Sequence, residues 1–458
     1  MSTKINCVDV PDNKLFGAIV KYSIPLMLAG FLQLLFNAAD VVVVGRFAED
    51  SEAALAAVGS TGSLINLLVN LFTGLSVGVS VTVSHYYGGG DEKNVSKTAH
   101  TSLIISVISG LALMLVGLFF SRTFLSWMDT PDSVIDLASI YMQIYFVGIP
   151  ASLIYNFCSA VIRSVGDTKT PFIILSCAGV INVLLNMLLV IVFHLDVVGV
   201  ATATTVANWC SAAAIVFYMA KAQGCIQLKL KWMTVNKRIL KKIILIGLPA
   251  GLQGICFSIS NVIIQSALNS FNDKVVLSAN TAAANIEGFI YILMNACYHA
   301  CVTFTGQNIG SGRKDRISKV ALRCAILTVA VGMSLGFVFC LLLGKNMIGI
   351  YITDSPLAIE YGYTRLCRVG LLYFLYGLID VIVGSVRGMG SSTSSMIVML
   401  FGVCGIRILW ISFIFKASPT LSTLYLSYPV SWLITLGIIL ALFFIDKKRV
   451  LNGRRPLP

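Results

Sequence analysis

The chain of 458 residues is 57% hydrophobic and only 12% charged, with a mean hydropathy of +0.88. Soluble proteins carry about 25% charged residues, so this composition excludes a soluble enzyme and indicates an integral membrane protein. The formal charge of +13 does not indicate a nucleic-acid partner, because the basic residues gather in short connections between apolar segments. The N-terminus lacks the apolar core of a signal peptide, so we expect no cleavage.

An α-helix needs about 20 apolar residues to cross a bilayer, and twelve such segments follow one another. We expect helices at 15–45, 55–86, 98–121, 134–158, 170–193, 197–220, 240–268, 278–308, 320–343, 358–386, 393–415 and 421–445. The predicted fold is all-α and integral to the membrane, with two six-helix lobes. The expected parts are a cytoplasmic N-terminus at 1–14, an N-lobe at 15–220, a cytoplasmic linker at 221–239, a C-lobe at 240–445 and a basic cytoplasmic tail at 446–458.

Basic residues predict the orientation of these helices, because cytoplasmic loops carry an excess of Lys and Arg. If both termini share one side, that side receives 24 of the 33 basic residues and the other side receives five. Both termini are therefore predicted to be cytoplasmic, in a multi-pass protein of the plasma membrane.

The chain also repeats itself at an offset of about 224 residues, as three pairs illustrate: Pro25 with Pro249, Gly30 with Gly254, and Asn37 with Asn261. GDEKNVSK at 90–97 similarly recurs as GRKDRISK at 312–319. Each half holds an even number of helices, so both halves enter from the same side. We expect them to be related by a pseudo-twofold axis along the membrane normal, with a central cavity typical of transporters.

The first helix carries a polar stripe, since Gln33, Asn37 and Asp40 lie at i, i+4 and i+7. A carboxylate at membrane depth costs about 2.5–3.5 kcal/mol on insertion scales and persists mainly beside a cavity or inside a bundle. Asp40 is therefore our first functional residue. The structural alternative for any intramembrane carboxylate is an ion pair with a nearby arginine.

Two further carboxylates, Glu287 and Asp380, lie inside predicted helices of the second half. The same alternative applies to them, and Arg365, Arg368 and Arg387 are close to Asp380 in sequence. Intramembrane Asn and Thr side chains have their own structural alternative, which is hydrogen bonding between helices.

No nucleotide-binding, nucleophile-elbow or paired-aspartate metal motif occurs, so we expect neither an enzyme nor a cofactor. Cys297, His299 and Cys301 do not converge on a straight helix, so no metal site is expected there. The twelve cysteines show no secreted-type spacing and are interpreted as reduced packing residues. An ion gradient is then the expected energy source.

The loop GQNIGSGRKDR at 306–316 resembles the loop between helices 8 and 9 of the multidrug and toxic compound extrusion (MATE) transporters. Asp40, fifteen residues after Pro25, and the paired segments at 163–171 and 386–394 resemble this family too, and the similarity spans residues 14–446. The resemblance implies a V-shaped pair of six-helix lobes. It also implies a multidrug efflux antiporter that exports amphipathic, often cationic compounds in exchange for H⁺ or Na⁺.

The DinF-like branch is the closer resemblance, and it implies a coupling-ion cluster in the N-lobe at Asp40, Asn182, Asn186 and Thr204. Asn37 is a further partner of Asp40. Some members have a carboxylate where this chain has Asn186. The acids of the NorM-like branch fall near Phe257 and on Tyr376 here, so Glu287 and Asp380 are only secondary coupling candidates.

With one carboxylate in the cluster, H⁺ is favoured over Na⁺ bound directly to Asp40, Asn182 and Thr204. Aromatic and methionine side chains suit flat, lipophilic cations, although membrane packing is the alternative for each of them. The predicted substrate-cavity residues are Gln33, Tyr155, Phe289, Tyr291, Met294, Tyr373 and Tyr376. The expected partners are small organic cations or amphipaths and membrane lipid, with no nucleic acid, and a monomer is expected.

Three other functions compete with this one. A lipid or lipid-linked oligosaccharide flippase of the same superfamily is the nearest. A major-facilitator exchanger should carry a Gly–Asp–Arg signature between helices 2 and 3, where this chain has YYGGGDEKNVSK. A membrane enzyme or receptor lacks a catalytic constellation here, and ligand-dependent flux would separate a transporter from a receptor.

Overall fold

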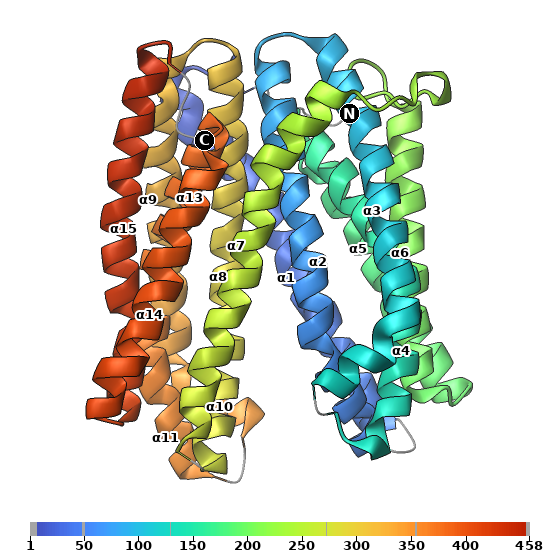
Figure 1. Ribbon diagram of the computed structural model, residues 1–458, viewed down its shortest axis with the longest axis vertical. Coiled ribbons are helices and arrows are strands. Elements are labelled where there is room, and N and C mark those ends of the chain that lie inside the picture. The colour runs from blue at the N-terminus through green and yellow to red at the C-terminus, as the bar shows by residue number, and fades with distance from the viewer. Residues whose placement is uncertain (1–6, 48–50, 129, 272, 353–354, 455–458) are drawn as a thin grey trace. The chain divides into compact units, whose positions relative to one another are not determined.

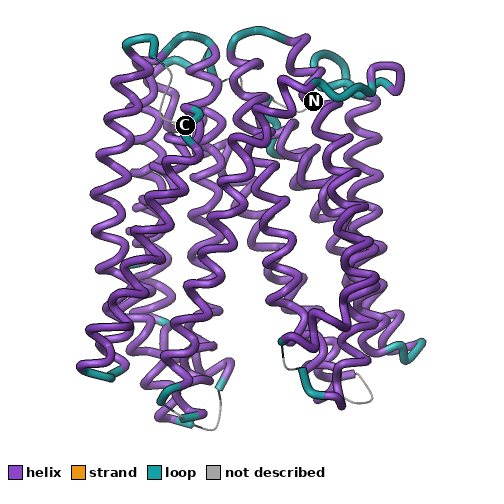
Figure 2. The backbone as a smooth tube through the Cα atoms, in the orientation of Figure 1, coloured by secondary structure: helices purple, strands orange, loops and turns teal. Residues whose placement is uncertain are grey.

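The computed structural model describes residues 7–47, 51–128, 130–271, 273–352 and 355–454. All regular structure in these ranges is helical, and Figure 2 shows helices joined by loops and turns. Twelve segments of the described chain are helices long and apolar enough to cross a membrane. The prediction of an all-α integral membrane protein with twelve transmembrane helices is confirmed. Helices form because a chain in lipid must satisfy its backbone N–H and C=O groups internally.

The described chain divides into two compact units, each a bundle of helices that run lengthwise in Figure 1. Unit 1 comprises residues 28–251, and unit 2 comprises residues 7–27 and 252–454. Helices α1 (Leu15–Phe47) and α7 (Lys237–Asn269) each contribute a part to both units. The predicted division into two repeated lobes, at 15–220 and 240–445, stays a prediction.

Unit 1 is built from helices close to the predicted spans. Besides its parts of α1 and α7, it contains α2 (Ser51–Gly88), α3 (Glu92–Trp127), α4 (Asp132–Ser164), α5 (Lys169–Asn186), the π-helical segment η2 (Met187–Val192), α6 (Asp196–Lys221) and the 3-10 turn η3 (Leu230–Trp232). Helix α4 packs on α2, α3 and α6. Apolar side chains such as Val83, Phe157 and Ile162 form a fully buried core here.

Unit 2 is more interrupted than the sequence indicated. Besides its parts of α1 and α7, it contains η1 (Asp12–Lys14), α8 (Lys274–Gly310), η4 (Lys314–Arg316), α9 (Ile317–Gly336), η5 (Phe337–Leu342), α10 (Gly344–Tyr351), α11 (Pro356–Arg365), η6 (Leu366–Gly370), α12 (Tyr373–Met389), α13 (Ser392–Met399), η7 (Leu400–Gly405), α14 (Ile406–Leu409), η8 (Trp410–Phe415) and α15 (Leu421–Leu451). The short helix α10 lies where the sequence indicated a loop. Segments η5, η6, η7 and η8 are π-helical. This geometry is rare in proteins overall, but it is common at functional sites.

The repeated loops adopt the same backbone turn in both units. Gly90 and Gly312, the first residues of the two matching segments, have φ values of 72° and 79°. Only glycine adopts this left-handed conformation without strain. In unit 1 the Asp91 carboxylate then caps α3 by accepting the Asn94 N–H at 3.0 Å. The sequence repeat is therefore a repeat of local structure.

Large apolar side chains cover much of the surface. Phe119 on α3 is 77% exposed and Phe413 on η8 is 70% exposed. Monomeric soluble proteins rarely expose extended apolar patches. These exposed apolar side chains are therefore those expected of residues that face lipid.

The chain just before α1 is tied to unit 2. The Cys7 N–H donates to Gln307 Oε1 at 3.1 Å, and Arg316 Nη2 donates to the Val10 carbonyl at 2.7 Å. Arg316 also forms an ion pair of 2.7 Å with Asp12. Cys7 is fully buried, and burial raises the pKa of its thiol.

We expect Arg316→Ala to release this segment and expose Cys7. Because the thiolate is the reactive form, alkylation of Cys7 by a maleimide should accelerate roughly tenfold or more. Mass spectrometry of the N-terminal peptide measures the rate. Lys319→Ala is the control, since Lys319 also pairs with Asp12 but is half exposed. Equal Cys7 rates in wild type and Arg316→Ala would contradict the role of Arg316.

Candidate functional site

Asp40 lies in unit 1 in a hydrogen-bonded group of four residues, here called the Asp40 ring (Asp40, Asn182, Asn186 and Thr204). Asn186 Nδ2 donates to Asp40 Oδ1 and to Asn182 Oδ1, the latter at 3.3 Å. Asn182 Nδ2 donates to Thr204 Oγ1 at 3.1 Å, and Thr204 lies close to Asp40. Four residues predicted to bind the coupling ion therefore meet, from helices α1, α5 and α6.

Local structure explains how α1 and α5 approach each other. A Cβ atom on Gly179 would overlap the ring of Phe36, so the glycine leaves the space that the α1 side chain occupies. Asn182 and Asn186 are one helical turn apart, which places both amides on one face of α5. Asn186 is the last residue of α5, and the π-helical segment η2 begins at the next residue.

The ring retains unused binding capacity. Asn186 is fully buried, and its Oδ1 atom has no hydrogen-bond partner among the described residues. Carboxylate, amide and hydroxyl oxygens are ligands for hard cations, and a carboxylate is also a proton acceptor. Tyr141 and Tyr145 of α4 lie within electrostatic range of Asp40. Sequence reasoning missed these two tyrosines, because nothing distinguishes them from other aromatic residues of an apolar helix.

The remaining polar residues of the predicted stripe lie elsewhere. Gln33 and Asn37 are both exposed on α1, whereas Asp40 is half-buried. The structure therefore brings only the last member of the stripe into the ring.

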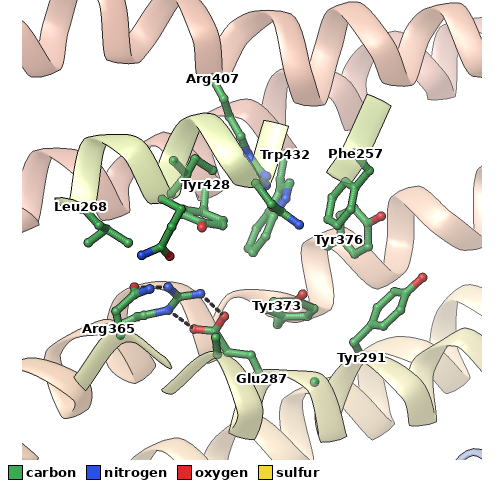
Figure 3. A pocket seen from close by; sticks show the side chains of 16 residues that line it. Phe257, Leu268, Glu287, Tyr291, Arg365, Tyr373, Tyr376, Arg407, Tyr428 and Trp432 are labelled. Atoms are coloured by element: carbon green, nitrogen blue, oxygen red, sulfur yellow. Dashed lines mark hydrogen bonds and ion pairs between the residues drawn. The ribbon is translucent and has the colours of Figure 1, made fainter. Parts of the chain in front are cut away.

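Unit 2 contains a cavity of about 290 Å³. Three predicted substrate residues, Tyr291, Tyr373 and Tyr376, line it (Figure 3). Sequence reasoning missed other residues that line it, among them Phe257, Asn261, Arg365, Arg407, Tyr428 and Trp432. They come from α7, α11, α14 and α15, whose convergence leaves no signal in the sequence.

The other predicted substrate residues do not line this cavity. Gln33 and Tyr155 belong to unit 1, where the Tyr155 hydroxyl donates to the Pro171 carbonyl at 2.8 Å. Met294 is buried beside Gly332 and Gly377. Phe289 is half-buried on α8.

Glu287 forms a buried ion pair within the cavity wall. Its carboxylate accepts Arg365 Nε at 2.9 Å and Arg365 Nη2 at 2.7 Å, as the dashed lines in Figure 3 show. Arg365 Nη1 also donates to Asn280 Oδ1. The structural alternative for Glu287, pairing with an arginine, is therefore the arrangement observed.

Asp380 has a different environment. Tyr291 and Asn295 lie close to it, and Asn295 Nδ2 donates to the Tyr291 hydroxyl at 3.2 Å. Arg387 lies within electrostatic range but donates to the Tyr298 hydroxyl at 2.8 Å and to Gln253 at 2.6 Å. No ion pair of the described residues includes Asp380.

The cysteines offer no metal site within the described ranges. All twelve lie within these ranges, and none of them is in a disulfide. Among the described residues, no group of three or more His, Cys, Asp or Glu side chains is placed to hold a metal ion.

The comparisons with known proteins identify the family. The model of the MatE family matches residues 25–188 and 249–411, well over half of the chain. The chain belongs to the MatE family. It is 29% identical over 402 residues to the Bacillus subtilis protein named "Probable multidrug resistance protein YpnP", covering 87% of this chain and 88% of that one. It is 22% identical to the multidrug export protein MepA of Staphylococcus aureus, strain bovine RF122 / ET3-1, over 86% of this chain and 87% of MepA.

The fold of this MatE protein is shared by solved structures. An outward-facing multidrug resistance MATE family transporter superposes with a TM-score of 0.91 at 19% sequence identity, over 98% of this chain and 99% of that one. MatE proteins are transporters. The predictions of this family and of a protein that is not an enzyme are confirmed, and the DinF-like branch stays a prediction.

We expect Glu287→Gln to destabilise the protein, because it leaves the buried Arg365 guanidinium without its counter-charge. Removing one partner of a buried pair costs about 3–5 kcal/mol. Thermal unfolding in detergent should show a clear fall in Tm, partly recovered in the double variant with Arg365→Gln. Glu360→Gln, which breaks the exposed pair with Lys345, is the matched control. An unchanged Tm with Glu287→Gln would contradict a structural role for the pair.

Proposed function

We propose that this MatE protein is a multidrug efflux antiporter that exports amphipathic, cationic organic compounds in exchange for a cation bound at the Asp40 ring. The observation that carries the proposal is the ring itself, with Asp40 facing two amides and a hydroxyl from other helices. An intramembrane carboxylate paired with no arginine marks an ion pathway by default. The names of the YpnP and MepA relatives support the export of drugs.

The exchanged cation is H⁺ in this proposal. Asp40 is the ring's only carboxylate, and one proton neutralises it. Protonation of Asp40 from the outside removes the negative charge that lies next to Asn186 and Thr204. This change alters the packing of α1 on α5 and α6. Pro25 lies inside α1 and lacks a backbone N–H, so it permits the helix to bend. Sodium is the alternative, since the oxygens of Asp40, Asn182, Asn186 and Thr204 suit it.

The orientation follows from charge. We place both termini in the cytoplasm and the protein in the plasma membrane as a monomer surrounded by lipid, because 24 of the 33 basic residues then face inward. Within the family, we assign the chain to the DinF-like branch, since its Asp40 ring lies in the N-terminal half. Deprotonation toward the cytoplasm then restores the drug-binding state.

We expect Asp40→Asn to abolish proton-driven export while retaining the bound drug. Purified protein in sodium-free liposomes, with an imposed pH gradient and a fluorescent lipophilic cation, measures the flux. The variant should lose at least roughly 90% of it, because a neutral amide does not exchange a proton at this position. Asp136→Asn, at an exposed carboxylate of α4 that pairs with Arg122, is the matched control and should keep wild-type flux.

Equal flux in wild type and Asp40→Asn would remove Asp40 from coupling and direct attention to Asp380. Flux that appears only when sodium is added would reverse the choice of ion. Translocation of a lipid-linked sugar without export of the dye would replace the efflux function by that of a flippase.

A further inference from the structure

Arg407 is a buried guanidinium in the wall of the unit 2 cavity, and its partners do not satisfy it. The residue is only 1% exposed. Arginine has five N–H donors, and Arg407 Nε donates to Ser431 Oγ at 3.2 Å. Its Nη1 atom is buried and has no hydrogen-bond partner among the described residues. No ion pair in the described chain includes Arg407.

Arg365, the second arginine that lines this cavity, has hydrogen-bond partners that include a carboxylate. Arg365 is held by both carboxylate oxygens of Glu287 and by Asn280. Its charge is therefore neutralised within the cavity wall. Among the residues lining the cavity, the charged ones are Glu287, Arg365 and Arg407. The lining consequently carries one net positive charge, and that charge is on Arg407.

Aromatic rings hold the Arg407 guanidinium in place. Its central carbon lies 4.3 Å from the ring centroid of Tyr428, 5.8 Å from that of Trp432 and 5.9 Å from that of Phe257. Ring faces attract a cation but provide no hydrogen-bond acceptor of carboxylate strength. In Figure 3 the Arg407 side chain extends toward Trp432, and Tyr428 lies nearby. The guanidinium is thus held in place while its Nη1 donor has no acceptor among the described residues.

The backbone around Arg407 is unusual as well. The residue lies in the short helix α14, between the π-helical segments η7 and η8. A π-helical turn inserts an extra residue into the helix and changes the direction of the side chains that follow. Of the two, η7 precedes Arg407 and therefore changes the direction in which its side chain points within this membrane span.

From this geometry we infer that the cavity of unit 2 binds aromatic acids, which are flat apolar molecules carrying a carboxylate or sulfonate. The acid group pairs with the Arg407 guanidinium, whose planar donors match a carboxylate. The aromatic body lies against Tyr373 and Trp432, whose ring centroids are 5.2 Å apart. A volume of about 290 Å³ suits one or two fused rings and not a pair of acyl chains. The inference adds an anionic substrate class to the cationic compounds proposed above and rests on the proposed function for export, but binding is measurable without it.

The test is equilibrium dialysis of the purified full-length protein with two matched probes, naphthoate and its neutral isostere naphthamide. Wild type should bind naphthoate at least roughly tenfold more tightly, because only the acid supplies a counter-charge. Arg407→Gln should reduce this preference to about one, and Arg407→Lys should retain part of it, since lysine keeps the charge but not the planar donors. Arg122→Gln removes an exposed positive charge of unit 1 and should leave the preference unchanged.

Three outcomes would overturn the inference. The first is equal binding of the two probes to wild type, a comparison that requires no variant to fold. The second is a naphthoate preference that survives in Arg407→Gln. The third is displacement of naphthoate by phosphatidylglycerol added to phosphatidylcholine nanodiscs in wild type but not in Arg407→Lys, which would assign the guanidinium to a lipid phosphate.

Export of the lipophilic dye by the same preparation separates this inference from the proposed function. Dye export without a naphthoate preference rejects the aromatic-acid site alone. A naphthoate preference that depends on Arg407, without dye export, supports the site and rejects the proposed transport of cations.

Discussion

The structure depends on one constraint, which is that a polar group inside an apolar bilayer must find its partner within the protein. The backbone meets this constraint by forming helices throughout. Charged side chains meet it in different ways. Asp40 is surrounded by amide and hydroxyl donors, Glu287 is paired with Arg365, and Arg407 is held by aromatic rings. These three arrangements differ in how many hydrogen-bonding groups they leave without a partner among the described residues.

The Glu287–Arg365 pair leaves little unused, because both oxygens of the carboxylate accept from one guanidinium. Such a pair fixes the cavity wall. The Asp40 ring is different, since its donors are neutral and one amide oxygen of Asn186 has no partner in the described structure. A carboxylate held only by neutral groups changes its charge without stranding an opposite charge. This property suits an ion-coupling site.

The two halves of the chain share a scaffold but not a chemistry. The left-handed turns at Gly90 and Gly312 preserve the duplicated loop. At the repeat offset of 224 residues, however, the residue that corresponds to Asp40 is Ile264, and the residue that corresponds to Asn186 is Trp410. After duplication, unit 1 thus has a polar ring where unit 2 has apolar and aromatic residues. The two units therefore differ in chemistry, with a buried polar group around a carboxylate in one and an aromatic cavity in the other.

The sequence alone determined the twelve spans and the repeat. It also identified the residues of the Asp40 ring, through its resemblance to a known family. Hydrophobic length sets the spans, and a carboxylate in an apolar helix is costly enough to stand out. The pairing of Glu287 with Arg365 and the placement of Arg407 were decided only by the tertiary structure. Both depend on helices far apart in sequence, and the placement of Arg407 depends also on η7, the π-helical segment that precedes it. An extra residue in a helical turn changes the direction of every later side chain, and no periodic pattern in an apolar segment records it.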